Sequence, residues 1–182
     1  MEPFKIVEGR FGKALVAMRP IPEKTILFGG NDWWDEEERK SFIELTPAEV
    51  QRLDPSRRRI FLKYAYNHHP TRILGTLDPN APRHPSNFLN HSCEPNTGYD
   101  LHDHVVTLRD VDFGEELTMD YGTFTFSFDQ EFLCGCGTPK CRRKVTGADW
   151  KQLVHQYGYG FPSFMHDRIR EIFGRPGMGL GP

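Results

Sequence analysis

Apolar and polar residues alternate in short segments along the first two thirds of the chain. Phe4 to Val7 and Lys13 to Ala17 flank a turn that holds two glycines, which is typical of paired strands. Similar segments predict further short strands, at Thr25 to Phe28, Ile60 to Tyr66, Val105 to Leu108 and Glu116 to Met119. The stretch from Asn67 to Pro85 is rich in histidine, proline, asparagine and glycine, and we expect a long surface loop there.

Three other segments have the pattern of helices. Thr46-Pro47-Ala48-Glu49 is a capping box with proline at the first helical position, which predicts a helix from there to about Arg57. Intervals of three and four residues predict a helix over 148–157 with an apolar stripe for packing, made of Trp150, Leu153, Val154 and Tyr157. A second C-terminal helix is expected over 163–173. Many short strands with few helices indicate a β-rich α+β fold.

Composition changes this picture little. The chain has 182 residues and a formal net charge of −2, which fits one domain and gives no positive field that would attract nucleic acid. The basic triplet 57–59 is interpreted as a solvated helix end. No apolar run approaches the roughly 20 residues of a membrane span, and the N-terminus lacks the pattern of a secretory signal. Neither a membrane nor a nucleic acid is therefore an expected partner.

All four cysteines fall into one pattern, a lone Cys93 followed by Cys134, Cys136 and Cys141 close together. Four thiolates suit one tetrahedral structural zinc ion, which would tie a distant loop to the C-terminal segment. Two disulfides in an oxidising compartment are the alternative. A Cys-x-Cys pair beside a third cysteine, in a chain without a leader, favours zinc. Reduced thiols would place the protein inside a cell, in the cytoplasm or nucleus.

Three segments in order resemble the SET-domain protein-lysine methyltransferases that carry a post-SET zinc segment. Asn87-Phe88-Leu89-Asn90-His91-Ser92-Cys93-Glu94-Pro95-Asn96 is similar to the first signature of this family, and Gly114-Glu115-Glu116-Leu117-Thr118-Met119-Asp120-Tyr121 to the second. Phe132 to Arg142 is similar to the post-SET segment, and Glu8 to Ala17 to the N-terminal glycine turn of the family. The resemblance covers about Val7 to Arg143.

The resemblance implies a fold and a division of the chain. The fold would be the SET fold, several small sheets with a knot-like threading, followed here by short C-terminal helices. Residues 1–125 would form the SET domain with a variable insert at about 29–59, and 126–146 the post-SET zinc segment. Residues 147–173 would form a helical extension, and the glycine- and proline-rich residues 174–182 a disordered tail.

The resemblance also implies the chemistry, transfer of a methyl group from S-adenosylmethionine to the side-chain amine of a protein lysine. Tyr121 would be the catalytic residue, with its hydroxyl near the transferring methyl and the lysine nitrogen. Tyr66 and Met119 would line the lysine channel, although Tyr66 is equally well explained as a core aromatic. Methionine at 119, where many family members carry tyrosine or phenylalanine, cannot donate a hydrogen bond and is flexible. We therefore expect di- or trimethylation.

The expected cofactor-binding residues come from separate segments: Phe11, Gly12, Tyr64, Phe88, Asn90, His91 and Leu133. Asn90 can offer both a donor and an acceptor, and Gly12 permits close approach of the main chain. The alternative for Phe11 and Gly12 is a plain hairpin turn. Arg10 stands where the family often has the first glycine of the turn, which puts the geometry of this loop in question.

Other functions stay open at this stage. The predicted partner is a protein that presents a lysine, either a histone or a non-histone protein. The chain could instead be a catalytically weak SET-like protein-binding module, or a structural domain held together by zinc. The acidic stretch Asp32 to Glu38 would suit a basic peptide, or is a solvated loop.

Overall fold

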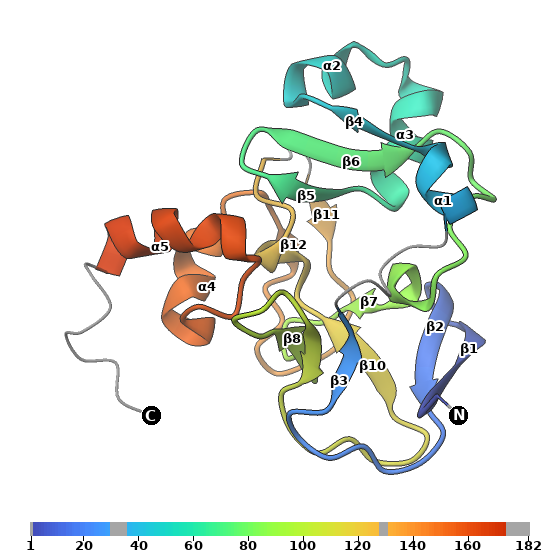
Figure 1. Ribbon diagram of the computed structural model, residues 1–182, viewed down its shortest axis with the longest axis vertical. Coiled ribbons are helices and arrows are strands. Elements are labelled where there is room, and N and C mark those ends of the chain that lie inside the picture. The colour runs from blue at the N-terminus through green and yellow to red at the C-terminus, as the bar shows by residue number, and fades with distance from the viewer. Residues whose placement is uncertain (1, 30–35, 128–130, 174–182) are drawn as a thin grey trace.

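The computed structural model describes residues 2–29, 36–127 and 131–173 (Figure 1). The largest sheet has the order β1 (Phe4–Gly9), β2 (Gly12–Ala17), β10 (Glu116–Met119) and β7 (Asn90–His91). A second sheet has the order β3 (Ile26–Phe28), β9 (Val105–Thr107) and β8 (Thr97–Tyr99). A third has the order β4 (Phe42–Leu45), β6 (Arg72–Thr76) and β5 (Tyr66–His69), and the smallest pairs β11 (Phe132–Leu133) with β12 (Lys144–Val145). The predicted β-rich α+β class is confirmed.

The largest sheet brings together motifs that lie far apart in the sequence. β10 pairs antiparallel with β2 and parallel with β7, so that Met119 stands opposite His91. Leu15 and Leu117 are completely buried in the core beneath this sheet. The chain that leaves β10 therefore carries Tyr121 to the side of His91.

The strands predicted at Phe4 to Val7, Lys13 to Ala17, Thr25 to Phe28, Val105 to Leu108 and Glu116 to Met119 are all present, with ends shifted by up to two residues. β4, β8 and the two strands of the smallest sheet were not predicted. They are only two to four residues long.

The predicted helix from Thr46 to about Arg57 is wrong in its extent. The capping box does start a helix, α2 (Pro47–Arg52), but a second helix follows it, α3 (Pro55–Lys63). Asp54 begins α3, because its side chain accepts hydrogen bonds from the backbone N–H groups of Ser56 and Arg57. Pro55 occupies the first helical position, where it starts a helix instead of ending one.

The predicted strand from Ile60 to Tyr66 is wrong for the same reason. α3 continues to Lys63, and β5 begins at Tyr66. Phe61 is completely buried in a core cluster with Val50, Ala65 and Ile73, which only the helical path provides. An alternation over so few residues does not distinguish a strand from one buried face of a helix.

The predicted surface loop from Asn67 to Pro85 is also wrong over its first half, which forms the β5–β6 hairpin. Asn67 is buried, and its side-chain amide donates to the carbonyl oxygen of Arg72 at 3.1 Å. Ile73 is 1% exposed. The polar composition of this segment gave no sign that Asn67 is buried or that β6 is a strand.

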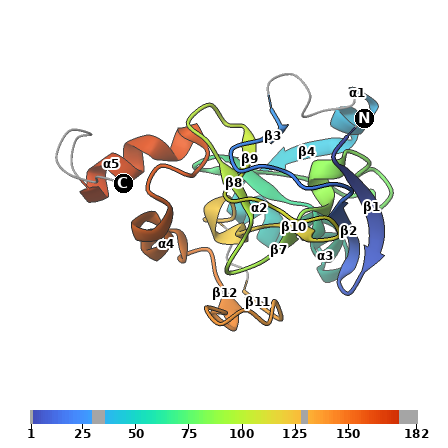
Figure 2. The ribbon, with the colours of Figure 1, turned by 90° about the horizontal axis from the view of Figure 1, so that it is seen from below.

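The C-terminal part forms a separate cluster on one side of the molecule, opposite β1 and β2 (Figure 2). It contains α4 (Trp150–Tyr157), the 3-10 helix η4 (Ser163–Met165) and α5 (His166–Phe173). Leu153 and Val154 pack against Phe126 and Ile169, while Trp150 and Tyr157 are partly buried, so the predicted stripe does serve packing. The predicted disordered tail, 174–182, lies outside the described residues. In the described ranges, no helix is long and apolar enough to cross a membrane.

Candidate functional site

Two cavities meet at Tyr121. One has a volume of about 300 Å³ and is lined by the end of α3 and the start of β5, by the end of β8, and by the segment after β10. The other has a volume of about 260 Å³ and opens between the β1–β2 turn and the cysteine segment. Tyr121 lines both of them, together with Lys63, Tyr64, Asn87 and Phe132. A molecule in one cavity and a molecule in the other would therefore come together beside the Tyr121 ring.

Tyr121 is held at both its side chain and its backbone. Its hydroxyl donates to the carbonyl oxygen of Leu89 at 2.8 Å, and its N–H donates to Nδ1 of His91 at 3.2 Å. The ring also packs against Phe124 and Phe132, with centroid separations of 5.2 and 5.9 Å. Burial raises the pKa of the Tyr121 hydroxyl, so this group stays protonated at neutral pH.

His91 is a neutral, buried part of the same arrangement. Its side chain is 5% exposed, and burial lowers its pKa to about 4. Because Nδ1 accepts from Tyr121, the ring proton belongs on Nε2, which lies 3.4 Å from Sγ of Cys93. His91 therefore links the Tyr121 backbone to the cysteine cluster.

Tyr66 and Met119, predicted for the lysine channel, both line the larger cavity. Met119 is 3% exposed, and burial raises the pKa of Tyr66 well above its ordinary value. Tyr99 and Phe124 complete the aromatic wall, with ring centroids 6.5 Å apart, and neither was predicted. Tyr99 ends the unpredicted β8, so only knowledge of that strand would have pointed to it.

The seven residues predicted to bind a cofactor all line the smaller cavity: Phe11, Gly12, Tyr64, Phe88, Asn90, His91 and Leu133. They come from the β1–β2 turn, the C-terminal end of α3, β7 and its approach, and β11. The structure thus brings all of them together, and their roles remain predictions. Leu133 is 87% exposed, which is unusual for a leucine that belongs to a cavity wall.

The β1–β2 turn accommodates Arg10 without strain. Gly12 has a φ of 106°, the one positive φ in this turn, which favours glycine. Positive φ at described non-glycine residues is confined to Lys24, Asp103 and Arg143, so Arg10 has a conformation open to any residue. Its guanidinium stacks 5.0 Å from the Phe11 ring centroid. The departure from the family pattern at 10 therefore does not disturb the turn.

Asn90 is fixed by partners on two other strands. Its side-chain amide donates to Oε1 of Glu116 at 2.8 Å and to the carbonyl oxygen of Lys13 at 3.3 Å. These bonds use its donor hydrogens and leave the Oδ1 atom as the acceptor that it can present. Glu116 belongs to the second sequence motif, but its contact with Asn90 was not predicted.

Glu38 corrects the interpretation of the acidic stretch 32–38, of which 32–35 lie outside the described residues. Glu38 belongs to α1 (Glu36–Ser41) and is 1% exposed, so it is no part of a solvated acidic surface. Its carboxylate accepts from the side-chain amide of Asn87 at 2.6 Å and from the N–H of His84 at 2.7 Å. It anchors the segment before β4 to the wall of the site.

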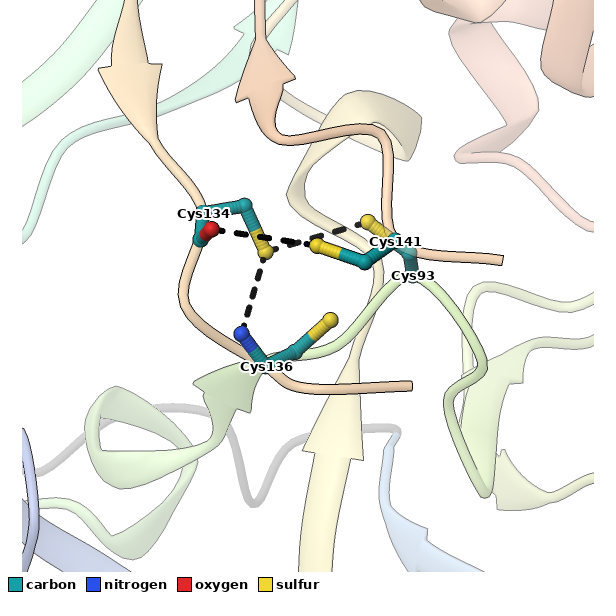
Figure 3. Close-up of side chains that lie close together, drawn as sticks. All are labelled: Cys93, Cys134, Cys136 and Cys141. Carbon is teal, nitrogen blue, oxygen red and sulfur yellow. Dashed lines mark hydrogen bonds between the residues drawn. The ribbon is translucent and has the colours of Figure 1, made fainter. Parts of the chain in front are cut away.

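The four cysteines converge as predicted (Figure 3). The Sγ atoms of Cys93, Cys134, Cys136 and Cys141 all lie within 4.8 Å of one another, and all four thiols are free. Sγ of Cys93 lies 3.8 Å from Sγ of Cys134. Four sulfurs about 2.3 Å from a tetrahedral zinc ion would be about 3.8 Å apart, so the cluster fits that ion.

The exposed histidines do not form a second cluster of this kind among the described residues. His68 pairs with Glu44 at 2.9 Å, and His104 with Asp100 at 2.9 Å. Each of these two histidines thus has a local carboxylate partner.

The fold agrees with the comparison to known families. The family model of the SET domain matches residues 12–122. The match covers more than half of the chain, and the protein belongs to the SET-domain family.

Its relatives carry the names of histone methyltransferases. The chain is 41% identical over 78 residues to the histone-lysine N-methyltransferase trithorax of Drosophila virilis, 39% of this chain and 2% of that protein. It is 39% identical over 71 residues to the histone-lysine N-methyltransferase ATX2 of Arabidopsis thaliana, 35% of this chain and 6% of that protein. It is 36% identical over 75 residues to the probable histone-lysine N-methyltransferase set-23 of Caenorhabditis elegans, 37% of this chain and 31% of that protein. The chain thus spans less than a third of the length of each of these relatives.

Proposed function

We propose that the protein is an S-adenosylmethionine-dependent protein-lysine N-methyltransferase. The single observation that carries this proposal is the meeting of two separate cavities at Tyr121. Methyl transfer requires the donor sulfur, the methyl carbon and the accepting nitrogen to lie in line, and two cavities that share Tyr121 in their walls would suit that need. Membership in the SET family and the names of the relatives support the class of reaction.

The smaller cavity would hold the cofactor. Asn90 would present its Oδ1 acceptor to the amino-acid end, and the main chain at Gly12 would allow close approach to the ligand. Leu133, exposed in the free protein, would be covered when the cavity fills. S-adenosylmethionine, when bound, supplies a methyl group on a positively charged sulfur. The chain's own contribution is to orient that group towards Tyr121.

The larger cavity would hold the lysine side chain. Tyr66 and Tyr99 offer aromatic faces to the aliphatic stem and the cationic head of a lysine. The Tyr121 hydroxyl donates a hydrogen bond to the carbonyl oxygen of Leu89. The lone pairs of the hydroxyl oxygen can therefore face the partly positive methyl group as acceptors. When the nitrogen–methyl bond forms and the sulfur–methyl bond breaks, the electron pair of that bond stays on sulfur.

The amine must lose a proton to solvent before it attacks. Nδ1 of His91 is occupied by the N–H of Tyr121, so His91 is not available to accept that proton. The Tyr121 hydroxyl is protonated and is not a base at neutral pH either. The protein's part is to favour the neutral amine, because an apolar channel lowers the pKa of a lysine.

One zinc ion held by the four cysteines would complete the site, in the manner of a post-SET segment. Cys134 and Cys136 line the smaller cavity, so an ion that fixes them would also fix this part of the cavity wall. Four free thiols that suit a metal also favour a reducing, intracellular location. The substrate would be a protein that presents a lysine. Histones are first among the candidates because the relatives are named for them.

Labelled S-adenosylmethionine, incubated with core histones and with a cell lysate, tests this function. The wild-type chain is expected to label a lysine, and Tyr121→Phe to lower the rate by about 100-fold or more. Tyr159→Phe, in the C-terminal extension, is the matched control and should keep the wild-type rate. Label that survives in Tyr121→Phe, or that is found on a residue other than lysine, would count against the proposal.

A further inference from the structure

A group of polar side chains, one buried and three half-buried, lies beside Tyr121 but lines neither of its two cavities. It consists of Asp120, Arg142, Asp149 and Tyr157, and we name it the Asp120 cluster. Its members come from three parts of the chain: the turn after β10, the segment after Cys141, and α4 with the residue before it. Nothing in the sequence motifs assigned a role to Arg142, Asp149 or Tyr157.

Asp120 is the centre of the cluster. It is 1% exposed, and its two carboxylate oxygens accept from Nη1 and Nη2 of Arg142 at 2.7 and 2.6 Å. One oxygen also accepts from the N–H of Gly122 at 3.0 Å, and the other from the hydroxyl of Tyr157 at 3.2 Å. Asp120 thereby caps η3 (Tyr121–Thr123), the turn that begins with Tyr121.

Arg142 joins this centre to two other parts of the molecule. Its Nε donates to Oδ2 of Asp149 at 2.9 Å, at the start of α4. Its backbone N–H donates to Sγ of Cys93 at 3.4 Å, within the cysteine cluster. One side chain thus contacts the turn that carries Tyr121 and the helical extension, and its backbone contacts a cysteine of the cluster.

We infer that Arg142 and Tyr157 are positioning residues for methyl transfer, and this inference rests on the proposed function. They hold the Asp120 carboxylate in the orientation that caps the Tyr121 turn. A buried carboxylate without its partners turns towards other donors or towards water. Gly122 then loses its acceptor, and the Tyr121 ring moves relative to the two cavities. A displacement of about 1 Å at a reacting centre can lower a rate by about 100-fold.

The C-terminal extension is then part of the active-site support. Tyr157 lies on α4, beyond the cysteine segment, yet its hydroxyl reaches the residue next to Tyr121. The extension contributes one hydrogen bond through Tyr157 and one through Asp149 to the same guanidinium–carboxylate pair. The apolar stripe of the extension packs it against the rest of the chain. Its two polar groups, Tyr157 and Asp149, orient the Asp120–Arg142 pair.

Steady-state kinetics on Arg142→Lys against Arg143→Lys test the inference. Arg143 is the next residue and is exposed, whereas Arg142 is half-buried, so the pair makes the same chemical change at two guanidinium groups that differ in exposure. Lysine keeps the charge but loses the bidentate geometry. Arg142→Lys should lower kcat by about 10-fold or more with little change in either KM, and Arg143→Lys should change kcat by less than about twofold. Tyr157→Phe, which removes one hydroxyl, should lower kcat by about threefold.

Hydrogen exchange gives a second measurement that needs no turnover. The backbone N–H of Gly122 should exchange about 10-fold faster in Arg142→Lys than in Arg143→Lys. If the wild-type chain labels no substrate, the proposed function fails, and the exchange rates still decide whether Arg142 orders this turn. Equal rates and equal kcat in the two variants would overturn the inference. So would a loss of kcat that follows lost metal content or a lowered melting temperature.

Discussion

At the scale of single residues, Tyr121, the proposed catalytic residue, is held in place by two hydrogen bonds. Its hydroxyl proton is directed to the Leu89 carbonyl and its N–H to His91. This fixes the oxygen lone pairs and leaves them for the methyl group. The sequence motif pointed to Tyr121, but only the structure shows that the carbonyl oxygen of Leu89, two residues before His91, accepts the hydrogen bond from its hydroxyl.

Met119 carries the first prediction at this scale. It lines the larger cavity, which is proposed to hold the lysine, and also a further cavity of about 420 Å³, so a larger side chain has adjacent space. The wild-type chain should give di- or trimethyl-lysine, and Met119→Tyr should shift the product towards monomethyl-lysine. A tyrosine there fills the channel and adds a hydroxyl that can hold a water molecule. Mass spectrometry of the product reports the distribution, and a wild-type product that stops at monomethyl-lysine would contradict the prediction.

At the scale of elements, the β1–β2 turn determines how close the main chain comes to the smaller cavity. Gly12 has a φ of 106°, and a side chain there would meet no atom within 4 Å. The cost of Gly12→Ala is therefore backbone strain alone, about 1 kcal/mol or more of unfolding free energy. Because this turn lines the cavity, the variant should also weaken S-adenosylmethionine binding about 10-fold.

Gly114→Ala is the matched control for that change. Gly114 has a φ of 83° in the turn before β10 and likewise has open space around it, but it lines neither cavity. It should lose similar stability in a denaturant titration and bind the cofactor as the wild type does in calorimetry. Equal losses of affinity in both variants would show that the effect follows stability and not the position of the turn.

The elements also show where sequence patterns succeed and fail. The strands of the β1–β2 hairpin and β10 alternate over enough residues to be predicted, and the apolar stripe on α4 predicts its packing. The alternation within the segment 55–66 fits one face of a helix as well as a strand. The Asp54 cap decides in favour of the helix α3. β7, of two residues, pairs with β10, which is distant in sequence, and β8, of three residues, pairs with the neighbouring strand β9.

The candidate site was predictable to a different degree. The residues expected at the two cavities do line them. Most of them could be predicted because they lie in recognisable motifs. Tyr99, Phe124 and the Asp120 cluster lie outside those motifs or act through contacts with distant segments. Such contacts depend on tertiary packing, which a single sequence does not encode as a local pattern.

At the scale of the whole molecule, the cysteine cluster joins the loop after β7 to the segment between β11 and β12. Cys93 belongs to the loop after β7, whereas the other three cysteines lie between β11 and β12 or close to them. Elemental analysis should find one zinc ion per chain. Removal of zinc with a chelator should lower the melting temperature by several degrees and abolish cofactor binding, because Cys134 and Cys136 line that cavity. Added zinc should restore both, and a metal-free chain with full activity would contradict this prediction.

In the proposed function, the cofactor and the lysine occupy different cavities that meet at Tyr121. A crystal structure of the chain with S-adenosylhomocysteine and a lysine peptide tests it most directly. We expect the cofactor in the cavity of Phe11, Asn90 and Leu133, and the lysine in the cavity of Tyr66 and Met119. The sulfur should face the lysine nitrogen beside the Tyr121 hydroxyl. A cofactor in the Tyr66 cavity, or both ligands on one side of Tyr121, would contradict it.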